Sequence, residues 1–169
     1  MYIATPRINN PADLDISGLA VAVQRWRRDG QHVVLCHGCF DPLHHGHLLH
    51  LTEARQHGDL LIVTVTADRF VGKGAGRPVF SAQCRAEMLA ALRIVDGVAV
   101  SNSETAVYAL ETLMPHVYVK GIDYLRCRSP NLEIEIERAR TLGIQVEFTT
   151  TRKSSATEIA QRCGWLGGD

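Results

Sequence analysis

The segment Leu60-Leu61-Ile62-Val63-Thr64-Val65-Thr66 is the clearest strand in this sequence, because it carries no charge and is rich in β-branched residues. We expect it to be the central strand of a sheet. A shorter apolar run, Val33-Val34-Leu35-Cys36, predicts a second strand of the kind that parallel sheets bury on both faces. The two runs therefore predict the interior of a parallel sheet.

Helices and strands alternate along the rest of the chain. Apolar residues at helical spacing predict helices, at 13–28, 46–57, 81–93, 105–113, 132–142 and 156–163. Further strands are predicted at 98–100, 117–120 and 144–148. This alternation implies right-handed βαβ crossovers. The sequence thus predicts an α/β fold in a single domain, with a Rossmann-like, doubly wound parallel sheet of five strands and helices on both faces.

The composition narrows the classes of function. The chain has 169 residues, and 18 Lys and Arg balance 18 Asp and Glu, so no global positive field can hold a long nucleic acid by its phosphates. With 46% hydrophobic and 21% charged residues, intrinsic disorder is excluded. A small-molecule ligand is therefore favoured over a nucleic acid.

The sequence also gives expectations about the compartment. No apolar stretch reaches the roughly 18 to 20 residues that cross a bilayer, and residues 1–6 lack a signal pattern, so we expect a cytoplasmic protein that does not bind membranes. The five cysteines are an odd number, which favours free thiols in a reducing compartment.

The turn after the first predicted strand carries the strongest motif, Gly38-Cys39-Phe40-Asp41-Pro42-Leu43-His44-His45-Gly46-His47. In open parallel sheets, ligands bind beyond the carboxyl ends of the strands. His44 and His47 flank a glycine at the start of a predicted helix, where backbone N–H groups and the helix dipole attract anions. Because two imidazole donors would strengthen that site and Gly46 leaves room for a phosphate, the motif predicts a triphosphate site.

Two other interpretations of the same segment are weaker. Cys36-x-x-Cys39 and five nearby histidines suggest structural zinc, but no second ligand pair follows at zinc-finger spacing. For His45 and His50, a place on the surface without a specific role is the preferred interpretation.

Residues 38–47 resemble the GxFDxxHxGH signature of the cytidylyltransferase-like nucleotidyltransferases, and the resemblance extends from Val33 to Ile159. It implies transfer of a nucleoside monophosphate from CTP or ATP to a small phosphorylated acceptor, with release of pyrophosphate. Residues 31–169 would form the catalytic domain, preceded by an N-terminal extension, 1–30, that carries a helix.

The resemblance also implies roles for individual residues. His44, His47 and Lys73 would be catalytic, by binding the phosphates. Lys73 and Arg85 would lie on the acceptor side. The remaining nucleotide-binding residues implied are Gly38, Cys39, Phe40, Asp41, Gly46, Lys120, Gly121, Asp123, Arg152, Ser154, Ser155 and Thr157. Ala156 stands where many family members have a hydroxyl group.

Several of these residues have a structural alternative. Lys73 could be an ordinary solvated loop lysine, and Asp123 could cap a turn, as aspartate often does. Arg85 could form a salt bridge on a helix surface. Asp41 could either orient one of the histidines or cap its own loop. For Ser155 the two readings coincide, since a helix N-cap leaves neighbouring N–H groups for phosphate.

The substrates remain open at this stage. Residues 118–124 resemble the heptose-phosphate adenylyltransferases, whereas Val71-Gly72-Lys73-Gly74 resembles the cytidylyltransferases of small acceptors. We lean slightly to CTP with a phosphate or phosphonate acceptor. Mg²⁺ is expected to come with the triphosphate, and a homodimer is left open because relatives are often dimers. A non-catalytic nucleotide-binding domain is the alternative from another class.

Overall fold

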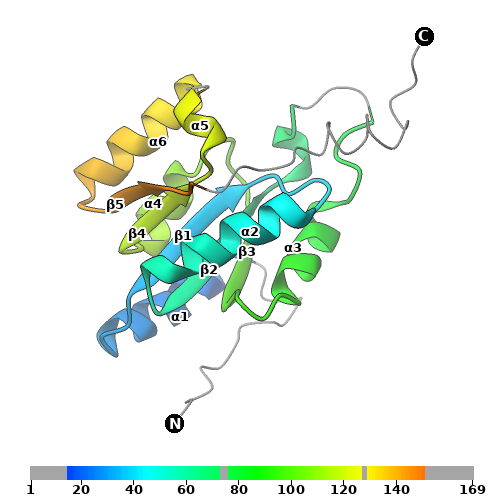
Figure 1. Cartoon of the computed structure of the whole chain (residues 1–169). Coiled ribbons are helices and arrows are strands. Elements are labelled where there is room, and N and C mark those ends of the chain that lie inside the picture. The colour runs from blue at the N-terminus through cyan, green and yellow to red at the C-terminus, as the bar shows by residue number, and fades with distance from the viewer. Residues whose placement is uncertain (1–14, 73–75, 127–128, 151–169) are drawn as a thin grey trace.

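The computed structural model describes residues 15–72, 76–126 and 129–150 (Figure 1). Its strands are β1 (Val33–Gly38), β2 (Leu60–Thr66), β3 (Gly97–Ser101), β4 (Val117–Lys120) and β5 (Gln145–Phe148). Its α-helices are α1 (Ile16–Arg28), α2 (His45–Ala54), α3 (Ala82–Ala90), α4 (Val107–Leu113), α5 (Asp123–Arg126) and α6 (Pro130–Thr141). Two short 3-10 turns follow α2 and β2, at Arg55–His57 and Asp68–Phe70.

The five strands form one parallel sheet in the order β3-β2-β1-β4-β5. This confirms the predicted α/β fold. The expectation that residues 60–66 form the central strand is wrong in one respect, because β1 holds the middle of the sheet and β2 lies beside it. All seven residues of β2 are buried. An uncharged run indicates a strand that is buried on both faces, and both β1 and β2 are such strands. It does not indicate the position of a strand within the sheet.

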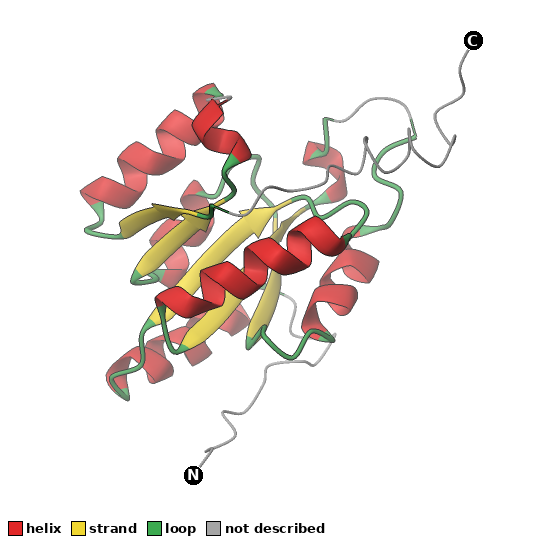
Figure 2. Ribbon diagram, in the orientation of Figure 1, coloured by secondary structure: helices red, strands yellow, loops and turns green. Residues whose placement is uncertain are grey.

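Helices cover both faces of the sheet (Figure 2). On one face, apolar residues of α1, α4 and α6 pack against Val33 and Leu35 of β1. On the other face, α2 and α3 pack against Val34 and Cys36, since neighbouring strand residues point to opposite sides. The sheet is therefore doubly wound.

The N-terminal helix α1 belongs to the core. Leu19, Val23 and Trp26 are buried against the sheet. A Cβ atom on Gly97 would come within 2.6 Å of Leu19 Cδ1, so α1 approaches β3 closely where that glycine stands. We predicted that residues 16–28 belong to an N-terminal extension. They form a helix that covers the same face of the sheet as α4 and α6.

The predicted boundaries differ from the structure mainly at helix ends. The helix predicted over 132–142 starts earlier, at Pro130, where the Ser129 side chain accepts a hydrogen bond from Leu132 N (3.2 Å). The stretch 121–131, predicted to be irregular, contains the single turn of α5. The helix predicted at 156–163 lies outside the described residues. Within the described ranges, no helix is long and apolar enough to cross a membrane.

Candidate active site

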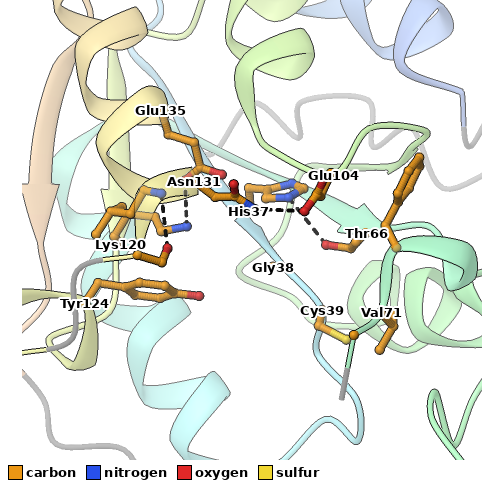
Figure 3. A pocket seen from close by; sticks show the side chains of 14 residues that line it. His37, Gly38, Cys39, Thr66, Val71, Glu104, Lys120, Tyr124, Asn131 and Glu135 are labelled. Atoms are coloured by element: carbon orange, nitrogen blue, oxygen red, sulfur yellow. Dashed lines mark hydrogen bonds and ion pairs between the residues drawn. The ribbon is translucent and has the colours of Figure 1, made fainter. Parts of the chain in front are cut away.

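The carboxyl ends of β1 and β4 meet where the strand order reverses. From β1 the chain proceeds to β2 and β3 on one side, and α4 then leads it to β4 on the other side of β1. Ligands of open parallel sheets bind at such switch points. Two cavities lie here, of about 230 and 120 Å³. Both are lined by His37, Gly38, Cys39, Lys120 and Tyr124, and Figure 3 shows the larger one.

The structure brings His44 and His47 together at the start of α2, as predicted. His44 is the extended N-cap residue, and its backbone N–H donates to Nδ1 of His47 (3.3 Å). The two rings stack with their centroids 3.8 Å apart. Because Nδ1 of His47 accepts this hydrogen bond, the neutral ring carries its proton on Nε2, which makes Nε2 a donor. The first N–H groups of the helix have no acceptor within the helix, so they add to an anion-binding end.

The ring of Phe40 packs against the histidine pair. Its ring lies edge-on to the His47 ring, with 5.1 Å between centroids, and the residue adopts a left-handed backbone conformation with φ of 52°. Such strain at a non-glycine residue is typical of functional sites. A Cβ atom on Gly38 would come within 3.2 Å of the Phe40 ring. Gly38 therefore leaves space for the ring that positions His47.

Asp41 has a different role from the one predicted for a nucleotide ligand. Its buried carboxylate accepts hydrogen bonds from the backbone N–H groups of Val79 (2.8 Å) and Phe80 (3.0 Å), and it pairs with Arg77 (3.2 Å). Burial alone would raise the pKa of Asp41, but these amides and the guanidinium outweigh it and lower the pKa. The structure thus supports the loop-capping alternative, in which Asp41 ties the loop after β1 to residues 77–80.

Arg85 does not fit the predicted contact with the acceptor, because its side chain has no exposed surface. The guanidinium donates to the carbonyl oxygens of Cys39 (2.6 Å), Thr66 (2.9 Å) and Phe80 (2.9 Å). It also pairs with Asp68 Oδ1 at 2.6 Å. The helix-surface alternative is wrong too, since this arginine lies inside the protein and holds the loops after β1 and β2 in place.

Lys120, predicted to bind nucleotide, ends β4 and is 4% exposed. Its Nζ donates to Glu135 Oε2 of α6 (3.0 Å) and lies 4.2 Å from the centroid of the Tyr124 ring. The Tyr118 hydroxyl donates to the same carboxylate oxygen (2.8 Å). Although burial alone would raise the pKa of Glu135, Lys120 and the other donors outweigh it and lower the pKa. Glu135 is therefore ionised at neutral pH and forms an ion pair with Lys120.

Two buried histidines were missed as candidate site residues. His37 lines both cavities, and its Nδ1 lies 2.9 Å from the hydroxyl of Thr64. Desolvation lowers the pKa of His37 to about 4, so this ring is neutral at physiological pH. His50, which we expected on the surface, is buried, with its Nδ1 3.0 Å from the Thr149 hydroxyl. His45 is exposed, as expected.

The predicted site residues gather at the smaller cavity, and three of them, Gly38, Cys39 and Lys120, also line the larger one. The smaller cavity includes six of them in its wall: Gly38, Cys39, Phe40, His47, Lys120 and Gly121. Gly46 is buried in the first turn of α2, and Asp123 is exposed at the start of α5. The predicted residues Lys73, Arg152, Ser154, Ser155 and Thr157 lie outside the described residues.

The zinc interpretation finds no support in the described ranges. They contain no group of three or more His, Cys, Asp or Glu side chains that could hold a metal ion. Nor does a disulfide join any of the described cysteines, Cys36, Cys39 and Cys84. The Mg²⁺ ion expected with the triphosphate stays a prediction.

Comparison with known proteins shows which sequences resemble this chain. The chain is 45% identical over 139 residues to the bifunctional protein HldE of Syntrophotalea carbinolica, covering 80% of this chain and 28% of that protein. It is 39% identical over 151 residues to the protein of the same name from Geotalea uraniireducens, covering 88% of this chain and 30% of that protein. The chain thus spans less than a third of these relatives.

A solved structure shows the same arrangement. The lipopolysaccharide core biosynthesis protein from Thermoplasma volcanium superposes with a TM-score of 0.60 at 25% identity, covering 75% of this chain and 100% of that one. The family model described as cytidylyltransferase-like matches residues 35–162, which include most of β1, the histidine pair at the start of α2 and Lys120. The chain therefore belongs to the cytidylyltransferase-like family of nucleotidyltransferases.

Proposed function

We propose that this chain is an adenylyltransferase, which transfers AMP from ATP to a heptose 1-phosphate or a closely related sugar phosphate and releases pyrophosphate. The observation that carries the proposal is the pair of adjoining cavities at the switch point. His47 lines the smaller cavity, and Lys120 lines both. One cavity can therefore hold the nucleotide and the other the acceptor, with Lys120 at their junction.

The reaction needs positioning more than covalent chemistry. A phosphate oxygen of the acceptor attacks the α-phosphorus, the new P–O bond forms, and the bond to pyrophosphate breaks in line with the attack. Negative charge spreads over the phosphate oxygens as this happens. The Nε2–H group of His47, the imidazole of His44 and the N–H groups at the start of α2 would donate to these oxygens, and this stabilises the transition state. We expect Mg²⁺ to arrive bound to the triphosphate, as part of the substrate.

The acceptor and the base rest on similarity. The HldE relatives and the resemblance of residues 118–124 to the heptose-phosphate adenylyltransferases both favour ATP with a sugar phosphate. The solved relative is a lipopolysaccharide core biosynthesis protein, which agrees with sugar chemistry. The slight preference for CTP that the sequence suggested is thus not supported, although the loop 71–74 keeps a cytidylyltransferase with a small acceptor as the second candidate.

A substrate panel tests the proposal. The protein is incubated with Mg²⁺, each of the four nucleoside triphosphates, and heptose 1-phosphate, glycerol 3-phosphate, ethanolamine phosphate or a phosphonate, and pyrophosphate release is measured. We expect release with ATP and heptose 1-phosphate, and its loss in His47→Ala. Release only with CTP would favour the second candidate. No release with any pair would favour a non-catalytic nucleotide-binding domain.

A further inference from the structure

Lys120 occupies the wall between the two cavities. Of the residues that line both, it is the charged one, since the others are His37, Gly38, Cys39 and Tyr124 and the buried His37 is neutral at physiological pH. If the nucleotide fills one cavity and the acceptor the other, the α-phosphate of the transferred adenylyl group lies beside this wall. A cation there meets the negative charge that grows during the transfer.

Glu135 is held in one position by three donors. Its Oε1 accepts from the backbone N–H of Ala106 (2.8 Å), and its Oε2 accepts from the Tyr118 hydroxyl (2.8 Å) and from Nζ of Lys120 (3.0 Å). These donors come from the start of α4 and from β4, while Glu135 itself lies on α6. A buried carboxylate with this many donors has a fixed orientation. The fixed carboxylate of Glu135 therefore also fixes the position of the Lys120 ammonium group that donates to it.

Glu135 is the ion-pair partner of Lys120, and both side chains are buried. The Lys120 side chain is 5% exposed, and a lysine that is desolvated without an opposite charge loses its proton at a much lower pH than usual. The titratable groups described around it are His37 from β1, Glu135 from α6, Tyr118 on its own strand and Tyr124 from α5. Glu135 supplies the negative charge among them. An ammonium has three N–H donors, and the ion pair uses one.

We propose that Lys120 contacts the α-phosphate of the adenylyl group during its transfer and that Glu135 is the positioning residue that keeps Lys120 charged and aimed at this phosphate. This inference rests on the proposed function. The proposal gives Glu135 a part in the reaction that it plays through Lys120, without contacting the substrate itself. The alternative is a purely structural ion pair that only anchors α6 to the sheet. The experiment must distinguish this alternative from the proposed role in the reaction.

The test is a pH profile of kcat/KM for ATP between pH 7 and 9, in four proteins. Glu135→Gln removes the negative charge, and Tyr118→Phe is the matched control, because it removes one hydrogen bond from the same carboxylate oxygen and leaves the charge. We expect the wild type and Tyr118→Phe to have similar profiles. Glu135→Gln should lose about tenfold or more between pH 7 and 9, as Lys120 loses its proton. Adding Lys120→Arg to Glu135→Gln should remove that loss, because guanidinium stays charged.

Two outcomes would overturn the proposal. One is a folded Glu135→Gln protein with the profile of the wild type. If that variant does not fold, the double variant Lys120→Met/Glu135→Met replaces the pair with side chains of similar volume, a change that buried ion pairs often tolerate. We expect it to lose about 100-fold or more in kcat, so a loss below threefold is the second outcome.

A failure of the proposed function would look different. In that case the wild type releases no pyrophosphate with any substrate pair. The same comparison is then made on the affinity for Mg²⁺-ATP, measured by calorimetry at pH 7 and 9. If only Glu135→Gln loses affinity at pH 9, the Lys120–Glu135 pair still has a role in phosphate binding. Equal affinities in all variants would refute that role.

Discussion

Replacing Arg85 with methionine tests whether this residue acts inside the protein or on a substrate. The guanidinium is fully buried and donates to three backbone carbonyl groups, of Cys39, Thr66 and Phe80. Methionine fills a similar volume but leaves these acceptors without their donor. Each buried acceptor that loses its partner costs about 1–3 kcal/mol, whereas loss of the pair with Asp68 costs little because the Asp68 side chain is 46% exposed to water. We therefore expect Arg85→Met to lower the free energy of unfolding by about 3–5 kcal/mol.

Urea denaturation, followed by circular dichroism, measures this loss. Gln83→Ala is the control, because Gln83 lies on the exposed side of the same helix and its replacement should change stability by less than about 0.5 kcal/mol. A residue that only contacts the acceptor would behave differently: Arg85→Met would then raise KM for the acceptor and keep the stability of the wild type. That result would refute the structural role assigned here.

Three further predictions concern the histidines and the turn beside them. His44→Ala and His47→Ala should each fold normally and lose about 100- to 1000-fold in kcat, measured as pyrophosphate release, because each removes a donor to the transferring phosphate. The pKa of His37 is about 4 in the folded protein and near 6.5 when unfolded, so the unfolded state binds the proton first as pH falls. The unfolding free energy should therefore decrease by about 3 kcal/mol between pH 6.5 and 4, at about 1.4 kcal/mol per pH unit, and His37→Leu should flatten that slope in denaturation experiments. Gly38→Ala should cost about 1–3 kcal/mol in thermal unfolding, because the added Cβ presses on the Phe40 ring, and unchanged stability would contradict the packing described.

The sequence could predict the elements that local pattern determines. Uncharged runs reveal β1 and β2 because both faces of these strands are buried, and the three-residue spacing of His44 and His47 places them on one helical turn. The predicted apolar face of α2 was less accurate. Leu48, Leu51 and Ala54 recur every three residues, but Leu48 and Ala54 point about 120° apart on a helix, and Leu48 is 40% exposed. Position 50 faces inward instead, and it carries a histidine.

The roles of the buried ions could not be predicted from residue type alone. Glu133, Glu135 and Glu137 alternate with isoleucines in α6, yet only the middle glutamate is buried. A signal was nevertheless present in the spacing. The inward residues of α6 are Leu132, Glu135, Ile136 and Ala139, at i, i+3, i+4 and i+7, so the glutamate interrupts an apolar stripe. The spacing within α6 does not reveal the partner of Glu135, because Lys120 comes from another element.

The same spacing recurs in α3, on the opposite face of the sheet. Its inward residues are Ala82, Arg85, Ala86 and Leu89, again with one charged residue at the i+3 position of the stripe. Burial of apolar surface does not require either charge, since an apolar side chain would complete each stripe and buried ion pairs contribute little net stability. Both charges instead reach the carboxyl edge of the sheet. Arg85 holds the backbone after β1 and β2, and Glu135 holds Lys120 at the end of β4. The strand ends that form the candidate site are thus fixed from both faces by the two residues that break the hydrophobic pattern of their helices.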